Sequence, residues 1–179
     1  MSVKIIYFVH GTTLDNETGK STGWAGGELS ELGIKQAKDL KDQIKERDFE
    51  VMFCSDLKRA VDSANLGFDG YCPIIQDKRL RECNYGDLTQ ANEDLVNYYN
   101  QIDKPFPNGE SLKDVEARIR DFVEYLKKEY NNKCIAIMAH KAPQLALEVV
   151  LNGKAWEQAL NEDWRNKKAW QPGWVYKTL

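Results

Sequence analysis

Two histidines are the side chains of this sequence best suited to chemistry near neutral pH, and the 179-residue chain has no others. An imidazole can act as a nucleophile, a proton donor or a proton acceptor. His10 and His140 each follow directly after a short apolar run, and Arg59 lies five residues after a third such run. The carboxyl ends of parallel strands share one edge of a sheet, where ligands bind. We therefore expect both histidines and Arg59 in one site, although a single histidine is more often a hydrogen-bonded structural residue.

The elements that must position these side chains can be predicted from the apolar pattern. Continuous apolar runs at 5–9, 51–54 and 135–139 are typical of parallel strands covered on both faces. Helical periodicity covers 30 to about 47, 56–66 and 111–130, with Ser30, Ser55 and Ser111 as expected N-caps. Pro143 and Gly153 bracket a further helix. The pattern predicts an α/β fold, a three-layer sandwich with a mainly parallel central sheet and helices on both faces.

The length predicts one domain, 1–179, without a dividing linker. The polar stretch 84–108 is long for a plain connection, so we expect a lid-like excursion over one end of the sheet. Four of the five tryptophans lie near the end of the chain, at Trp156, Trp164, Trp170 and Trp174. They either pack the tail onto the sheet, with 175–176 as a last strand, or form an aromatic rim or an interface patch.

The composition excludes several classes of function. The balance of 25 Lys and Arg against 28 Asp and Glu gives a net charge of -3, which argues against nucleic-acid binding through overall basicity. The sequence has no run of 18 apolar residues for a membrane span and no signal-peptide layout at its start. Its four cysteines form no C-x-x-C pair, and two histidines complete no familiar zinc pattern. We therefore expect a cytoplasmic protein with reduced thiols and no bound metal.

Several short segments resemble, in order, the motifs of a known family. They are His10-Gly11 with Asn16, Thr22-Gly23-Trp24, Leu29-Ser30-Glu31-Leu32-Gly33, Ser55-Asp56-Leu57-Lys58-Arg59-Ala60, Leu80-Arg81-Glu82 with Gly86, Gly109-Glu110-Ser111, and His140. Together they resemble the histidine phosphatase superfamily, with its phosphoglycerate-mutase-like fold, over about residues 3–153. Considered without these motifs, Arg59 is as easily a surface residue of a helix, and Glu82 is one of many solvated acidic residues. The segment 19–21 looks like the end of a P-loop, but Leu14 stands where that motif needs glycine.

The resemblance implies a catalytic set of His10, Arg59, Glu82 and His140. His10 would attack phosphorus and become a transient phosphohistidine, and a nearby Arg59 favours the neutral imidazole that this attack needs. Arg59 and His140 would hold the phosphoryl oxygens, while Glu82 would protonate the leaving oxygen and later activate water. The same resemblance places Gly11, Asn16 and Thr22 at the phosphate end. It implies a small phosphorylated substrate and neither metal nor cofactor.

The match fails at the residue before the nucleophile, where the family's arginine is replaced by Val9. Next to the second histidine, a position that is usually glycine holds Lys141, which either restores the lost charge to the phosphate site or points to solvent. Thr12 stands where the family has an acidic residue.

Three functions follow from this pattern. The first is a phosphomonoesterase that works through a phosphohistidine at His10. The second is a catalytically impaired member that binds a phosphorylated ligand or partner, for which Val9 is the argument. The third is a phosphoglycerate-type mutase, suggested by Thr22-Gly23-Trp24, although the stretch 84–108 lacks the insertion that mutases carry. No feature of the sequence fixes an oligomeric state.

Overall fold

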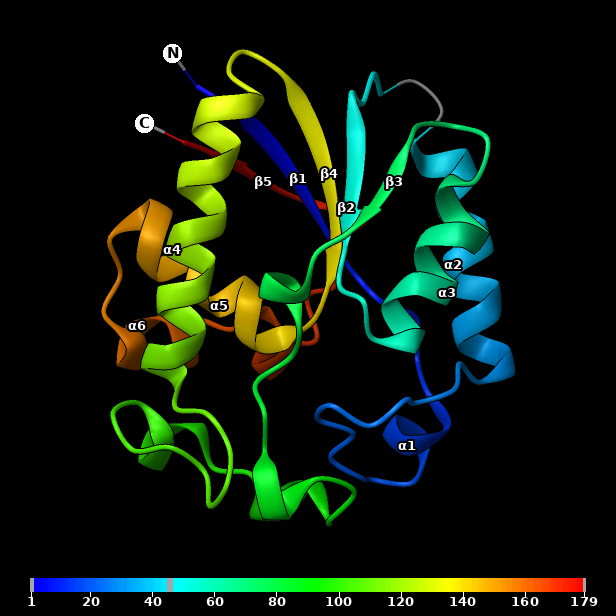
Figure 1. Ribbon diagram of the computed structural model, residues 1–179. Coiled ribbons are helices and arrows are strands. Elements are labelled where there is room, and N and C mark those ends of the chain that lie inside the picture. The colour runs from blue at the N-terminus through cyan, green and yellow to red at the C-terminus, as the bar shows by residue number, and fades with distance from the viewer. Residues whose placement is uncertain (1, 45–46, 179) are drawn as a thin grey trace.

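A five-stranded sheet forms the centre of the computed structural model, which describes residues 2–44 and 47–178 (Figure 1). The strands lie in the order β3-β2-β4-β1-β5. Their bounds are Lys4–Val9 for β1, Val51–Cys54 for β2, Ile74–Gln76 for β3, Cys134–Ala139 for β4 and Trp174–Lys177 for β5. Only β5 runs antiparallel to its neighbour, β1. The predicted mainly parallel sheet is therefore confirmed.

Helices cover both faces of this sheet, as predicted. One face carries α2 (Glu31–Ile44) and α3 (Lys58–Phe68), and the other carries α4 (Leu112–Glu129), α5 (Lys141–Asn152) and α6 (Trp156–Asn161) (Figure 1). The strand side chains alternate between two apolar cores, with Ile5 and Tyr7 in the α4–α5 core and Ile6 and Phe8 in the α2–α3 core. Because both faces are buried, the strands read as continuous apolar runs rather than alternating ones.

Two of the three predicted N-caps, Ser30 and Ser111, are confirmed, and the third, Ser55, is not. The Ser111 hydroxyl accepts from the backbone N–H of Asp114, whose carboxylate accepts from the Ser111 N–H, so α4 begins with a capping box. The hydroxyl of Ser30 accepts from the third residue of α2. The prediction for Ser55 is wrong, because α3 begins after Leu57, and Ser55 accepts the Leu57 N–H within the preceding turn.

The predicted helix from 30 to about 47 corresponds to α2, which ends at Ile44. Residues 45–46 lie outside the described residues. Among the residues that the structure describes, no helix combines the length and apolar character needed to cross a membrane.

The stretch 84–108 forms short turns of 3-10 helix below the carboxyl ends of the strands (Figure 1). These turns are η2 (Gly86–Leu88), η3 (Glu93–Leu95) and η4 (Tyr98–Gln101), and η1 (Lys78–Leu80) precedes them. Three aromatic side chains, Tyr85, Tyr98 and Phe106, pack against one another and anchor the stretch to the α4–α5 core. A bridge between Lys20 and Asn92 joins it to the loop after α1 (Leu14–Glu17).

The tryptophan-rich tail packs back onto the sheet. Trp156 is buried at the start of α6, and η5 (Trp164–Lys167) leads into β5. The ring of Trp164 stacks on that of Trp174, with centroids 4.8 Å apart. Since Trp174 pairs with Tyr7 of β1, this stack ties the tail to the strand that His10 follows.

Candidate active site

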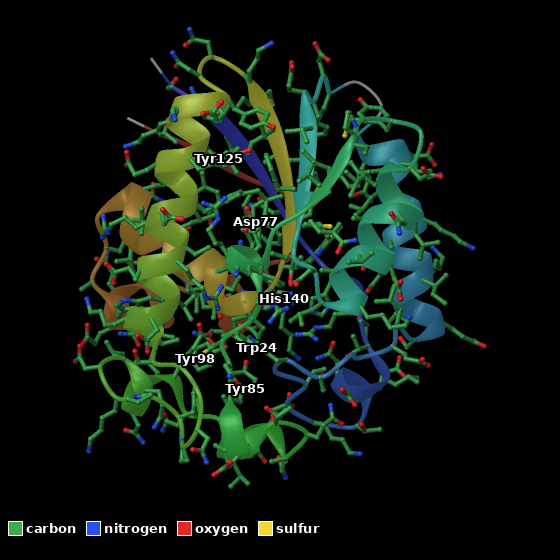
Figure 2. All side chains as sticks on the ribbon, viewed as in Figure 1. Trp24, Asp77, Tyr85, Tyr98, Tyr125 and His140 are labelled. Carbon is green, nitrogen blue, oxygen red and sulfur yellow. The ribbon has the colours of Figure 1, made fainter. Side chains whose placement is uncertain are left out.

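A cavity of about 950 Å³ opens at the carboxyl edge of the sheet, between the strand ends, the stretch 84–108 and the tail. All four residues of the predicted catalytic set line it: His10 after β1, Arg59 in the first turn of α3, Glu82 after η1, and His140 after β4. Figure 2 shows His140 at this edge, with Tyr85, Tyr98 and Trp24 beneath it. Parallel strands bring together residues up to 130 positions apart because their carboxyl ends coincide.

The tautomer of His10 follows from its two hydrogen bonds. Its Nδ1 lies 2.7 Å from the carbonyl oxygen of Gly11, which can only accept, so Nδ1 carries the proton. Its Nε2 then holds a lone pair and accepts from the Nε–H of Arg59 at 3.3 Å. The lone pair that could attack phosphorus therefore points into the cavity toward the arginine.

The imidazole of His10 is held in its neutral form. Loss of hydration, with the positive charge of Arg59 as the next cause, lowers the pKa of His10 to about 3. A histidine that is neutral at physiological pH can act as a nucleophile without first losing a proton.

Arg59 is buried and fixed on three sides. Its Nη1 and Nη2 donate to the backbone carbonyls of Ala25 and Gly23, at 3.1 and 2.8 Å, while its Nε donates to His10. Only 2% of the residue is exposed, so the guanidinium has little freedom to move. Such a fixed cation beside the nucleophile can bind the oxygens of a phosphoryl group without reorganisation.

His140 is buried, yet neither nitrogen of its ring has a hydrogen-bond partner within the described part of the chain. The ring centroid lies 5.0 Å from that of His10. Burial is the main cause that lowers the pKa of His140 well below its ordinary value, and Arg59 adds to the shift. The hydroxyl of Tyr7 accepts from the backbone N–H of His140 and donates to its carbonyl, which fixes the β4–α5 corner. An unpartnered buried imidazole in a cavity is suited to bind a ligand oxygen.

The carboxylate of Glu82 lies at the start of α5. Its Oε2 accepts from the backbone N–H of Lys141 at 3.1 Å, and its Oε1 accepts from those of Ala142 and Cys83. The N-cap residue, His140, makes no side-chain cap bond, so Glu82 satisfies these helix N–H groups in its place. Within the described residues Oε2 has one donor, so it is the oxygen with room for a proton.

Tyr98 of the stretch 84–108 also holds Glu82, and Tyr85 holds Tyr98 in turn. The hydroxyl of Tyr98 donates to Oε1 at 3.3 Å, and the hydroxyl of Tyr85 lies 2.7 Å from that of Tyr98. Burial raises the pKa of both tyrosines well above the ordinary value, so both hydroxyls stay protonated and can donate. The backbone carbonyl of Glu82 accepts from Trp24 Nε1 and from Arg118, which fixes the loop.

The three residues predicted for the phosphate end lie near His10 in different ways. Asn16 and Thr22 line the cavity, although the side-chain oxygen Oδ1 of Asn16 also accepts from the backbone N–H of Thr13, the N-cap of α1. The N–H of Gly11 donates to Ser63 Oγ, so its carbonyl, which orients His10, is the part of Gly11 that acts in the site.

Lys141 lines the cavity, but its ammonium group also contacts Asp163 and the ring of Tyr98. Its Nζ lies 3.6 Å from Oδ2 of the buried Asp163 and 5.0 Å from the centroid of the Tyr98 ring. The side chain is 40% exposed, so it is neither free in solvent nor aimed at the nucleophile alone.

The sequence left open whether the tail packs on the sheet or forms an aromatic rim, and it did not point to Arg165. Trp164, Arg165 and Trp170 line the cavity, so the tail both packs on the sheet and forms an aromatic wall. The tryptophan cluster was the available signal, but Arg165 lies outside every motif. The four cysteines are free, and within the described residues no group of three potential ligands could hold a metal ion.

The fold and the site define a class of protein, the α/β proteins with a phosphoglycerate-mutase-like fold and two histidines at the strand ends. The sequence matches the histidine phosphatase superfamily (branch 1) over residues 6–169, and the chain belongs to this superfamily.

Relatives of known name include both mutases and phosphatases. The 2,3-bisphosphoglycerate-dependent phosphoglycerate mutase of Nitrobacter hamburgensis is 32% identical, over 91% of this chain and 88% of the relative. Among solved structures, the alpha-ribazole phosphatase of Shigella flexneri is 28% identical with a TM-score of 0.76, covering 90% of this chain and 84% of that one. A mycobacterial glucosyl-3-phosphoglycerate phosphatase is 25% identical with a TM-score of 0.77, covering 89% and 84%.

Proposed function

We propose that this protein is a phosphomonoesterase that hydrolyses a small phosphorylated substrate through a phosphohistidine at His10. The observation that carries the proposal is the tautomer of His10, whose unprotonated Nε2 points into the cavity toward a fixed guanidinium. The unpartnered ring of His140 beside it supplies a further contact for phosphoryl oxygens.

The reaction has two steps. In the first, Nε2 of His10 forms a bond to phosphorus while the bond to the leaving oxygen breaks, and Glu82 gives its proton to that oxygen. In the second, Glu82 takes a proton from water, the water oxygen bonds to phosphorus, and the P–N bond breaks to restore neutral His10. The donors on Glu82 hold its carboxylate beside His140 in both steps.

Charge distribution supports binding of a phosphate monoester. Arg59 stabilises the equatorial oxygens as negative charge shifts during transfer. Tyr99 and Trp170 are exposed on the wall of the cavity, which leaves a path for the water of the second step.

The test is turnover of p-nitrophenyl phosphate by the purified protein in the presence of a chelator. We expect activity in the wild type and none with His10→Ala. Lys58→Ala, which changes an exposed lysine next to Arg59, is the matched control and should remain active. Quenching with detergent at alkaline pH during turnover should trap a phosphoenzyme that is stable to base and labile to acid, and that His10→Ala does not form. Full activity of His10→Ala would refute the proposal.

A mutase is the second candidate, because the similarity to phosphoglycerate mutases covers most of both chains. Interconversion of 2- and 3-phosphoglycerate that depends on added 2,3-bisphosphoglycerate, and that exceeds release of inorganic phosphate, would favour it. Absence of both reactions, with vanadate binding retained, would favour the catalytically impaired member suggested by Val9.

A further inference from the structure

Among the described residues, four cationic side chains line the cavity, those of Lys20, Arg59, Lys141 and Arg165, against the three carboxylates of Glu82, Glu93 and Asp94. We propose that Arg165 is a second phosphoryl-binding arginine, which holds the transferring group from the sheet face opposite to Arg59. The proposal rests on the proposed function and adds a binding residue to that same site.

The geometry of β1 places an opening for such a cation beside His10. Alternation along the strand puts Ile5, Tyr7 and Val9 on the face covered by α5 and the tail. Val9 is the last residue of β1, lines the cavity, and packs against the core on that face. A short side chain here leaves room next to the nucleophile, and Arg165 lines the same cavity from the tail.

Arg165 is fixed in place by aromatic and polar contacts. Its guanidinium carbon lies 4.4 Å from the centroid of the Trp164 ring, and that ring stacks on Trp174. Its Nη1 donates to Asp163 Oδ1 at 2.9 Å, and its Nη2 donates to Gln144 Oε1 at 3.1 Å. A guanidinium has five N–H groups. The side-chain bonds found within residues 2–44 and 47–178 use two of them, so the others can bind a ligand oxygen.

The anchor at Gln144 brings Arg165 to within one helical turn of the second histidine. The backbone N–H of Gln144 donates to the carbonyl of His140, which closes the first turn of α5. The positive charge of Arg165 also contributes to lowering the pKa of both His10 and His140, after the larger effects of burial and Arg59.

The neighbouring charges do not cancel Arg165. Asp163 lies between Lys141 and Arg165, and these two cations and one carboxylate sum to a charge of +1. The positive charge of Lys141 therefore offsets the negative charge of Asp163. A planar guanidinium stacked on an aromatic ring is also better preorganised for phosphate than a flexible lysine. These contacts favour Arg165, rather than Lys141, as the residue that binds the phosphoryl oxygens.

Equilibrium binding of orthovanadate, followed by calorimetry, tests the proposal without needing turnover. Arg165→Ala should weaken vanadate binding about 10- to 100-fold, the loss of one charge-assisted contact. Arg165→Met, which keeps a long side chain over Trp164, should bind as weakly as Arg165→Ala, and Arg165→Lys should lie between them and the wild type. Lys167→Ala, an exposed cation of η5 outside the cavity, is the control and should bind like the wild type.

An Arg165→Met protein that melts like the wild type and binds vanadate within twofold of it would overturn the proposal. Val9→Arg in the Arg165→Met background should recover at least part of the lost affinity, because it places a guanidinium on the same face. A wild type that binds vanadate but hydrolyses no aryl phosphate would refute the proposed function, while the comparison of variants would still decide the role of Arg165.

Discussion

Lowering the pH from 7 to 5 should destabilise the folded protein, because its two histidines are held neutral. An unfolded chain exposes His10 with an ordinary pKa of about 6.5, whereas the folded site lowers it to about 3. Between these values the unfolded state binds a proton that the folded state does not. Above about pH 6.5 His10 therefore does not change the free energy of unfolding with pH. As the pH falls from 6.5 toward 3, His10 lowers the free energy of unfolding.

The size of the effect follows from the same two pKa values. At pH 5 nearly all unfolded chains carry the proton on His10 and almost no folded chains do, which costs about 2 kcal/mol relative to pH 7. The pKa of His140 is also lowered, so it adds to this loss. Aspartate and glutamate contribute little in this window, because their ordinary pKa values are about 4.

The assay is urea unfolding at pH 7, 6 and 5 in a phosphate-free buffer. The free energy of unfolding should fall by at least about 2 kcal/mol in the wild type. His10→Asn and His140→Asn should each reduce the pH dependence, and the double variant should nearly abolish it. A wild type equally stable at pH 7 and 5, or a His10→Asn protein with the wild-type slope, would refute the reasoning.

Three further predictions concern Glu82, its hydrogen-bond donor Tyr98, and Gly11, which follows His10. Glu82→Gln should lower kcat/KM about 100-fold or more for an alkyl phosphate, and less for p-nitrophenyl phosphate, whose leaving group needs no proton; equal losses in kcat/KM would contradict a general acid. Tyr98→Phe removes one donor to Glu82 and should lower kcat about fivefold with little change in KM; an unchanged kcat would exclude this support. Gly11→Ala places a Cβ 2.4 Å from the carbonyl oxygen of Gly33, so thermal unfolding should show a loss of about 1–3 kcal/mol. An unchanged melting temperature would contradict this contact.

Local patterns predicted most of the fold. The apolar runs 5–9, 51–54 and 135–139 became β1, β2 and β4, because strands buried on both faces need apolar side chains at every position. The strand Ile74–Gln76 was missed, since it is three residues long and its side chains are half-buried or exposed. The cap at Ser55 was misplaced because a serine in a turn and a serine at an N-cap look alike in sequence.

The sequence by itself determined the family, and it pointed to His10, Arg59, Glu82 and His140, which line one cavity because the motifs lie where strands end. Their roles remain predictions. The hydrogen bonds that orient the side chains of those residues depend on the tertiary structure. The proton on His10 is assigned by a carbonyl one residue away and by Arg59, and Glu82 is held by a helix that begins almost 60 residues later. Arg165 lies in the tail, which contacts α5 through Gln144 and returns to β1 through β5. Such long-range contacts arise from packing, which no local pattern of residues encodes.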